Sequence, residues 1–277
     1  MITINGIEIS PERFPDGTYC LLNLPLDKFI TDDDAFHFVW KYEHNEELLL
    51  LWHLVLHFKD FADKSAEFYL HIQYMINARM DRIKHTCEVF TLKSTAKMIN
   101  LMGFDRVYVN DPHSNVTPAL LDRCIIKSPI NAIKSVIDRF KTNGYDVILF
   151  FPDTGAMKRY MDDFKGYHFL YGEKVRDWET GKITSLELKG SFTWTDKECV
   201  ILMIDDICSY GGTFYYSAKA LKEEFPTIKV FSYATHTENI FPRLDQAMEE
   251  GLIEEHFTTD SFLGSTKETH PKITVLC

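Results

Sequence analysis

The sequence predicts an α/β protein of two lobes, each containing a mostly parallel sheet flanked by helices. Apolar runs alternate with helical segments through the second half, a pattern typical of parallel sheets covered on both faces. A chain of 277 residues suits two ordinary domains of roughly 150 residues each. Hydrophobic residues make up 45% and charged residues 26%, which excludes a disordered or collagen-like chain. We place the boundary near residues 127–131, which gives lobes 1–128 and 129–277.

In the first lobe, turn signals at residues 5–6 and 15–17 predict short strands joined by hairpins within the first 25 residues. Apolar positions from about residue 32 to residue 61 recur at helical spacing and predict a helix. Residues 68–75 form an apolar run that predicts a buried strand. A helix over 91–102 is expected to end at Gly103, because glycine is the usual residue just past a helix C-terminus. Residues 106–110 predict another strand.

In the second lobe, we expect a helix over 130–142 that Gly144 ends, and another running from about residue 213 to residue 225. Strands are predicted at 146–151, 200–204, 229–235 and 272–276. Ligands of such sheets bind beyond the carboxyl ends of the strands. Candidate functional residues are therefore sought where these runs end.

Charge and cysteine usage limit the classes of function. The chain carries 30 Lys and Arg against 41 Asp and Glu, a net charge of −11, so general attraction to nucleic acid or anionic membranes is excluded. The longest apolar run, 48–58, is about half the ~20 residues that a membrane span needs. No signal peptide is visible, and the six cysteines contain no C-x-x-C pair. We expect a reduced cytoplasmic protein that acts on small molecules.

Segment 200–214 carries the strongest chemical signal. An apolar run ends in Asp205 and Asp206, and a short loop then leads through Gly211, Gly212 and Thr213 into a helix. Glycines let backbone N–H groups converge on an anion, and a helix N-terminus adds partial positive charge. Two carboxylates beside a phosphate are useful only if they bind sugar hydroxyls or a metal-bound diphosphate. The plainer interpretation is an acidic turn before a glycine-rich helix start.

This segment is similar to the ribose-5-phosphate-binding loop that type I phosphoribosyltransferases share with ribose-phosphate pyrophosphokinases. The loop alone does not separate these families. Further segments resemble pyrophosphokinase signatures in order along almost the whole chain: R-F-x-D-G at 13–17, A-R-x-D-R at 78–82, D-x-H at 111–113, P-D-x-G-x-x-K-R at 152–159, K-x-R at 174–176, A-T-H at 234–236 and T-D-S at 259–261. The chain is therefore identified as resembling a shortened, divergent pyrophosphokinase.

The resemblance implies two stacked lobes with a type I phosphoribosyltransferase-like fold. The first lobe would hold ATP and the oligomer contacts, and the second the ribose-phosphate loop and a catalytic flexible loop. ATP-binding roles fall on Phe14, Asp16, Arg79, Asp81, Arg82 and His113. Catalytic roles fall on Lys174, Arg176 and His113, and metal-binding roles on His113 and Asp153. Ribose-phosphate-binding roles fall on Asp205, Asp206, Ser209, Tyr210, Gly211, Gly212 and Thr213.

The resemblance also implies Mg²⁺ as cofactor, ATP as co-substrate and a homo-oligomer, because the family's adenine loop acts across a subunit boundary. Alternate residues of an extended segment point the same way, so Lys174 and Arg176 can both face developing phosphate charge. The plain alternative for them is an exposed hairpin with ordinary surface charges, and Arg79 and Arg82 can equally be surface charges. A lone histidine such as His113 is more often structural than a ligand.

Several positions depart from the family pattern. Ser209 and Tyr210 stand where the family commonly has Asp-Thr, and the tyrosine ring could stack on a base. Thr18 replaces a glutamate of the adenine loop, and Met80 replaces a glutamine. The chain begins 12 residues before Arg13 and stops after its last predicted strand, so we expect the family's first strand and helix and its closing helix to be missing.

Four functions remain in competition. The leading hypothesis is transfer of the β,γ-diphosphate of ATP to the C1 hydroxyl of ribose 5-phosphate, giving phosphoribosyl pyrophosphate for nucleotide biosynthesis. The same chemistry on ADP-ribose, serving NAD metabolism, is the second, motivated by Tyr210. A phosphoribosyltransferase is the third, and segments 13–17 and 174–176 argue against it. A non-catalytic regulatory homologue is the fourth.

Overall fold

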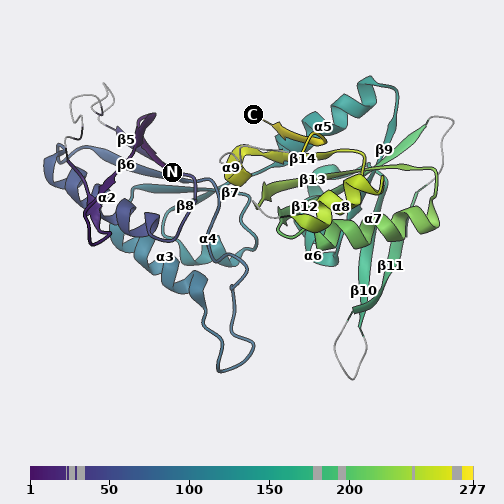
Figure 1. The fold of residues 1–277 in the computed structure, drawn as a ribbon, viewed down its shortest axis with the longest axis horizontal. Coiled ribbons are helices and arrows are strands. Elements are labelled where there is room, and N and C mark those ends of the chain that lie inside the picture. The colour runs from purple at the N-terminus through teal and green to yellow at the C-terminus, as the bar shows by residue number, and fades with distance from the viewer. Residues whose placement is uncertain are drawn as a thin grey trace. The chain divides into compact units, whose positions relative to one another are not determined.

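The computed structural model describes residues 1–22, 24, 29, 35–176, 183–192, 198–238, 241–263 and 270–276. The chain divides into two compact units, Met1–Ser128 and Pro129–Cys277 (Figure 1). Each unit contains its own sheet of mostly parallel strands with helices packed against it. The α/β class predicted from the sequence is therefore confirmed. No helix in the described ranges is both long and apolar enough to cross a membrane.

The first unit is built on a six-stranded sheet with strand order β2-β1-β5-β6-β7-β8. The strands β5, β6, β7 and β8 are parallel, and the hairpin β1–β2 adds to β5 in antiparallel register. The bounds are β1 Ile2–Ile4, β2 Ile7–Ile9, β5 Ala35–Trp40, β6 Glu67–Ile72, β7 Arg106–Asn110 and β8 Cys124–Lys127. A separate two-stranded hairpin joins β3 (Glu12–Arg13) to β4 (Tyr19–Cys20). Both hairpins follow the turn signals of the sequence.

The helices of this unit are α2 (Glu47–Phe61), α3 (Thr91–Met102) and the short α4 (Val116–Leu120). The Phe58 ring of α2 packs on Phe36 and Phe38 of β5, with ring centroids 5.3 and 6.0 Å apart. Gly103 ends α3 in the left-handed conformation, with φ +69°, as the sequence predicts. The alternation of β5 therefore gives one sheet face to the helices and leaves His37 on the other.

The prediction of one helix from residue 32 to residue 61 is wrong in its first part, since 35–40 is strand β5 and the helix begins only at Glu47. Residues 30–34 lie outside the described part of the chain. Phe36, Phe38 and Trp40 are buried and alternate with more exposed neighbours, which is the period of a strand. The apolar residues of the following helix concealed this short alternation. Strand β8 has no counterpart among the predicted elements.

The second unit is built on a seven-stranded sheet with strand order β11-β10-β9-β12-β13-β14-β15. All neighbours are parallel except the hairpin β10–β11. The bounds are β9 Asp146–Phe151, β10 Phe169–Arg176, β11 Ile183–Ser191, β12 Cys199–Cys208, β13 Lys229–Thr237, β14 His256–Thr259 and β15 Ile273–Leu276. The four predicted strands are confirmed, and β12 extends beyond the predicted 200–204 through both aspartates to Cys208.

Helices cover both faces of this sheet. Helix α5 (Ile130–Thr142) and α6 (Thr154–Tyr160), which continues into the 3₁₀ turn η1 (Met161–Phe164), pack on the face that carries Leu202 and Ile204. Helices α7 (Gly212–Glu224) and α8 (Pro242–Glu249) pack on the face that carries Ile201 and Met203, and lie side by side in Figure 1. The short α9 (Asp260–Leu263) follows β14.

A fully buried histidine links β13 to β14. His256 Nδ1 lies 2.8 Å from Ser232 Oγ, and Nε2 lies 2.9 Å from Thr237 Oγ1. Burial lowers the pKa of His256 to about 3, so the imidazole stays neutral in the folded protein.

Because the folded state resists protonation and the unfolded state does not, this histidine's stabilisation is present above pH 6.5 and is lost as the pH falls toward 3. We expect it to lower the free energy of unfolding by about 2 kcal/mol between pH 7 and pH 5. Urea unfolding of the wild type and of His256→Asn at both pH values checks this, and the variant should lose that pH dependence. Exposed His168→Asn is the control. Equal pH dependence in wild type and His256→Asn would refute the prediction.

Candidate functional site

The turn between β12 and α7 forms the centre of the site in the second unit. Gly211 is the N-cap of α7, with φ +78°, and no side chain among the described residues caps this helix end. The first N–H groups of a helix have no intrahelical partner, so this end presents donors and partial positive charge to an anion. The Arg243 N–H donates to the Tyr210 carbonyl at 2.9 Å, which ties the turn to the start of α8.

Gly211 is the one position in this turn where a side chain cannot fit. A Cβ atom there would lie 2.4 Å from Leu244 N and 2.6 Å from Leu244 Cβ, whereas one on Gly212 would meet nothing within 4 Å. Gly211 therefore permits the close approach of α8 to the turn. Gly212 keeps the space in front of the helix N-terminus open.

An acidic pair at the carboxyl end of β12 precedes the turn. Asp206 is 3% exposed and its Oδ1 lies 2.8 Å from Arg159 Nη1, whereas Asp205 is only partly buried. The Asp206 N–H donates to Asp205 Oδ1 at 3.0 Å. Burial, followed by the negative charge of Asp206 and a weaker effect of Asp153, holds the pKa of Asp205 well above its ordinary range. A cation bound next to Asp205 and Asp206, or hydroxyl groups that donate hydrogen bonds to them, would offset the repulsion between these carboxylates.

Asp153 lies at the carboxyl end of the neighbouring strand β9 and caps α6. Its Oδ1 accepts hydrogen bonds from the N–H groups of Gly155 at 2.9 Å and Ala156 at 3.0 Å. Its charge acts on Asp205, so the structure brings Asp153, Asp205 and Asp206 together at one edge of the sheet. The segment 152–155 is thus a helix N-terminus with an aspartate cap.

These carboxylates suit Mg²⁺ better than a transition metal. Within the described ranges, no three His, Cys, Asp or Glu side chains are grouped as a ready metal site. Mg²⁺ is commonly held by one or two carboxylates together with substrate phosphates and water. A divalent cation bound near Asp205 would offset the carboxylate repulsion that contributes to its raised pKa. The donor set of the second unit therefore fits Mg²⁺ bound with a phosphorylated substrate.

Two residues that the sequence analysis did not select belong to this site. Arg159 pairs with Asp206, and Glu238 Oε2 accepts a hydrogen bond of 2.5 Å from Ser209 Oγ. Glu238 directly follows β13, the strand beside β12, and its N–H donates to the Cys208 carbonyl at 2.8 Å. Residues that follow neighbouring parallel strands meet at the carboxyl ends of those strands. The position of Glu238 directly after the predicted strand could therefore have identified it from the sequence. Tyr210, the residue after Ser209, is 66% exposed.

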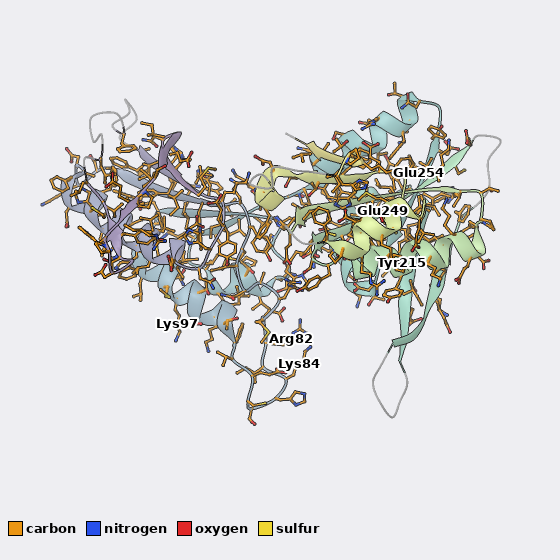
Figure 2. All side chains as sticks on the ribbon, viewed as in Figure 1. Arg82, Lys84, Lys97, Tyr215, Glu249 and Glu254 are labelled. Carbon is orange, nitrogen blue, oxygen red and sulfur yellow. The ribbon has the colours of Figure 1, made fainter. Side chains whose placement is uncertain are left out.

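In the first unit, the predicted ATP-binding residues Asp81 and Arg82 lie together on the loop between β6 and α3. Arg82 Nε donates to the buried Asp81 Oδ1 at 2.7 Å, and this bond holds the pKa of Asp81 below its ordinary value. A hydrogen bond from Ser114 and the charge of His113 act in the same direction, so His113 belongs to this group. Arg82 and Lys84 project from the loop in Figure 2.

The backbone is left-handed near the start of the two segments assigned to ATP binding from the sequence, 78–82 and 111–113. Asn77 has φ +62° and Asp111 has φ +33°, values that residues other than glycine rarely adopt. Asn77 Nδ2 donates to Thr95 Oγ1 at 2.9 Å, which anchors the first bend to α3. Arg79, two residues beyond Asn77, is exposed. Strained backbone of this kind is enriched at ligand sites, which favours a binding role for the loop.

Phe14 and Asp16 lie apart from that loop in the sequence, at the tip of the β3–β4 hairpin. Asp16 Oδ1 accepts hydrogen bonds from the Thr18 N–H at 3.0 Å and the Thr18 hydroxyl at 2.7 Å. The Phe14 ring is half exposed. Thr18 therefore closes the turn with two local hydrogen bonds to Asp16.

Lys174 and Arg176 lie on β10, whose backbone is extended and pairs with β11 in a hairpin. Their side chains, and residues 177–182, lie outside the described part of the chain. The extended backbone matches the alternation that the sequence argument assumed.

Comparison with known proteins identifies the relatives of this chain. No family model matches it. It is 29% identical over 187 residues to the ribose-phosphate pyrophosphokinase of Pyrococcus furiosus, covering 65% of this chain and 63% of that protein. It is 24% identical over 252 residues to the Thermococcus kodakarensis enzyme of the same name, covering 88% and 84%. Its fold matches the crystal structure of phosphoribosylpyrophosphate synthetase from Mycobacterium smegmatis with a TM-score of 0.75 at 18% identity, over 98% of this chain and 87% of that one.

The chain is similar to ribose-phosphate pyrophosphokinases over most of its length. The match covers 63% of the length of the Pyrococcus furiosus protein and 61% of that of the ribose-phosphate pyrophosphokinase of Pyrococcus abyssi, so the chain spans about three fifths of these two relatives. The structural match shows that the chain shares the fold of that synthetase. Tyr210, in the turn between β12 and α7, is 66% exposed.

Proposed function

We propose that this chain transfers the β,γ-diphosphate of ATP to the C1 hydroxyl of a 5-phosphorylated ribose, with ribose 5-phosphate as acceptor. The observation that carries the proposal is the N-terminus of α7, uncapped among the described side chains, which follows the acidic end of β12 in a chain similar to ribose-phosphate pyrophosphokinases. Helix N–H groups suit the 5-phosphate, and a carboxylate suits the vicinal ribose hydroxyls. The site thus offers complementary partners for both ends of the sugar.

In the proposed reaction, the C1 oxygen attacks Pβ of ATP and the bond from Pβ to the bridging oxygen of the α-phosphate breaks. AMP leaves with that oxygen, the diphosphate remains on C1, and the hydroxyl proton passes to solvent. Catalysis then consists of positioning and of charge neutralisation by fixed cations. Lys174 and Arg176 are proposed for that role, and the residues near Asp81 for ATP binding. Bound Mg²⁺ would supply further neutralisation. Asp153 is proposed as a Mg²⁺ ligand in the second unit, and His113 is proposed to contribute to catalysis as a Mg²⁺ ligand in the first.

Incubation with ATP, Mg²⁺ and ribose 5-phosphate tests the proposal directly. We expect AMP and a ribose carrying three phosphates in equal amounts, identified by mass spectrometry. Formation of ADP instead would indicate transfer of the γ-phosphate alone. Binding of both substrates without AMP would favour a regulatory homologue, and AMP formed only with a nucleobase present would favour a phosphoribosyltransferase. We also propose that the chain acts as a homo-oligomer, as the resemblance to pyrophosphokinases implies.

One observation favours a second acceptor, in which the 5-phosphate is esterified further, as in ADP-ribose. The carboxylate of Glu238, bonded to Ser209, places negative charge beside the turn that would receive the phosphate. A dianionic monoester is repelled there more than a diester with a single negative charge per phosphate. The exposed Tyr210 ring offers a surface on which the added adenine could stack.

Substitution of Tyr210 distinguishes the two acceptors. If the acceptor is ADP-ribose, Tyr210→Ala should raise its KM about fivefold, because aromatic stacking contributes about 1 kcal/mol. The KM for ribose 5-phosphate should not change. Tyr216→Ala, which removes a 57% exposed ring from the helix α7 that follows this turn, is the matched control. Equal KM values for ADP-ribose in wild type and Tyr210→Ala would remove the case for stacking.

A further inference from the structure

Arg159 is the residue that holds one member of the acidic pair in place. It lies in the last turn of α6, on whose inner face Ala156 and Tyr160 pack into the core beside Leu202 and Ile204. Its Nη1 lies 2.8 Å from Asp206 Oδ1. The side chain of Arg159 is 23% exposed and that of Asp206 4%, so this pair is largely shielded from water. Arg159 thus compensates the charge of a carboxylate that is covered by protein.

The two aspartates therefore differ in what remains available to a ligand. Asp206 is almost completely covered and its Oδ1 is paired with Arg159, whereas Asp205 keeps exposed surface at the strand end. Asp205 is in turn oriented by Asp206, whose N–H donates to Asp205 Oδ1 at 3.0 Å. Fixing Asp206 thus fixes the backbone segment that aims Asp205.

We infer that Arg159 is a positioning residue of the ribose site, acting through Asp206 so that Asp205 is the carboxylate that accepts the acceptor's 2-hydroxyl. The inference rests on the proposed function and assigns unequal roles within the Asp205–Asp206 pair. A carboxylate fixed opposite a hydroxyl discriminates strongly against a sugar that lacks it, because the carboxylate then loses its partner. Loss of positioning should therefore appear as loss of discrimination at C2.

The test compares ribose 5-phosphate with 2-deoxyribose 5-phosphate by titration calorimetry on the full chain. We expect the wild type to prefer the ribose compound at least about tenfold, as a hydrogen bond to a charged group contributes. Arg159→Met should reduce this preference below about threefold, and Arg159→Lys should restore part of it. Lys158→Met, which removes the exposed neighbouring cation, should keep the preference. Circular dichroism verifies folding.

A second variant guards against misfolding of Arg159→Met. Removing one partner of a shielded pair leaves an uncompensated charge, so Arg159→Met/Asp206→Asn removes both and should fold better. The double variant should still lack the preference for ribose 5-phosphate, because residue 206 is no longer anchored by Arg159. Retention of the preference in this double variant or in Arg159→Met, or its loss in Lys158→Met, overturns the inference while the proposed function stands. If the wild type binds neither sugar and forms no AMP, the proposed function itself falls.

Discussion

Alanine at Gly211 is expected to lower the free energy of unfolding by about 3 kcal/mol and to abolish binding of the acceptor's phosphate. The left-handed backbone alone costs a non-glycine residue about 1–2 kcal/mol, and the new Cβ would lie 2.4 Å from Leu244 N. Backbone cannot yield as a flexible side chain does, so α8 must move away from the turn. That movement breaks the Arg243 N–H bond to the Tyr210 carbonyl and reorients the N–H groups of α7. Thermal unfolding and calorimetry with ribose 5-phosphate measure the two effects.

Gly212→Ala supplies the matched control for stability. A Cβ at this position meets nothing within 4 Å, and alanine is favourable in the first turn of a helix. The free energy of unfolding should change by less than about 0.5 kcal/mol. The added methyl group lies where a phosphate would approach, so affinity for ribose 5-phosphate should fall although the fold is intact. Equal stability of the two alanine variants would show that the approach of α8 does not require Gly211.

The sequence predicted those parts of the fold in which one periodicity dominates. Helix 91–102, which ends at Gly103, and strand 146–151, which is followed closely by Asp153, are both confirmed. In each, the apolar pattern and the signal that ends the element agree. The strand Ala35–Trp40 was missed because six alternating residues adjoin a long apolar helix. The strand β14 was missed because its polar residues, among them His256 and Thr258, are buried in a hydrogen-bonded network that hydropathy does not reveal.

The residues of the candidate site likewise include some that the sequence identified and some that it did not. Local signals selected Asp205, Asp206 and the glycines, because carboxylates before a glycine-rich turn have a physical meaning at that spacing. Arg159 and Glu238 were not selected, since each acts through a residue distant in sequence, Arg159 on Asp206 and Glu238 on Ser209. Their importance depends on the parallel order β9-β12-β13, which places three strand ends side by side. No single segment of the sequence contains that order.

Lys174→Ala is expected to lower kcat by ~10²-fold or more while the KM values for ATP and ribose 5-phosphate change little, because a cation that meets charge only in the transition state contributes to rate rather than to substrate binding. Lys174 lies near the end of β10, in the extended backbone that lets it act together with Arg176. Single-turnover measurement of AMP release separates this effect from slow product release.

Lys189→Ala is the control for Lys174→Ala. Lys189 belongs to the partner strand β11 and lies 2.6 Å from Glu187 Oε2 and 3.9 Å from Glu173 Oε2, so its charge is engaged by surface carboxylates of the same hairpin. Its removal should leave kcat within about twofold of the wild type, since exposed ion pairs contribute little. Equal losses in both variants would assign the effect to disturbance of the hairpin. An unchanged kcat in Lys174→Ala would remove this lysine from the proposed mechanism.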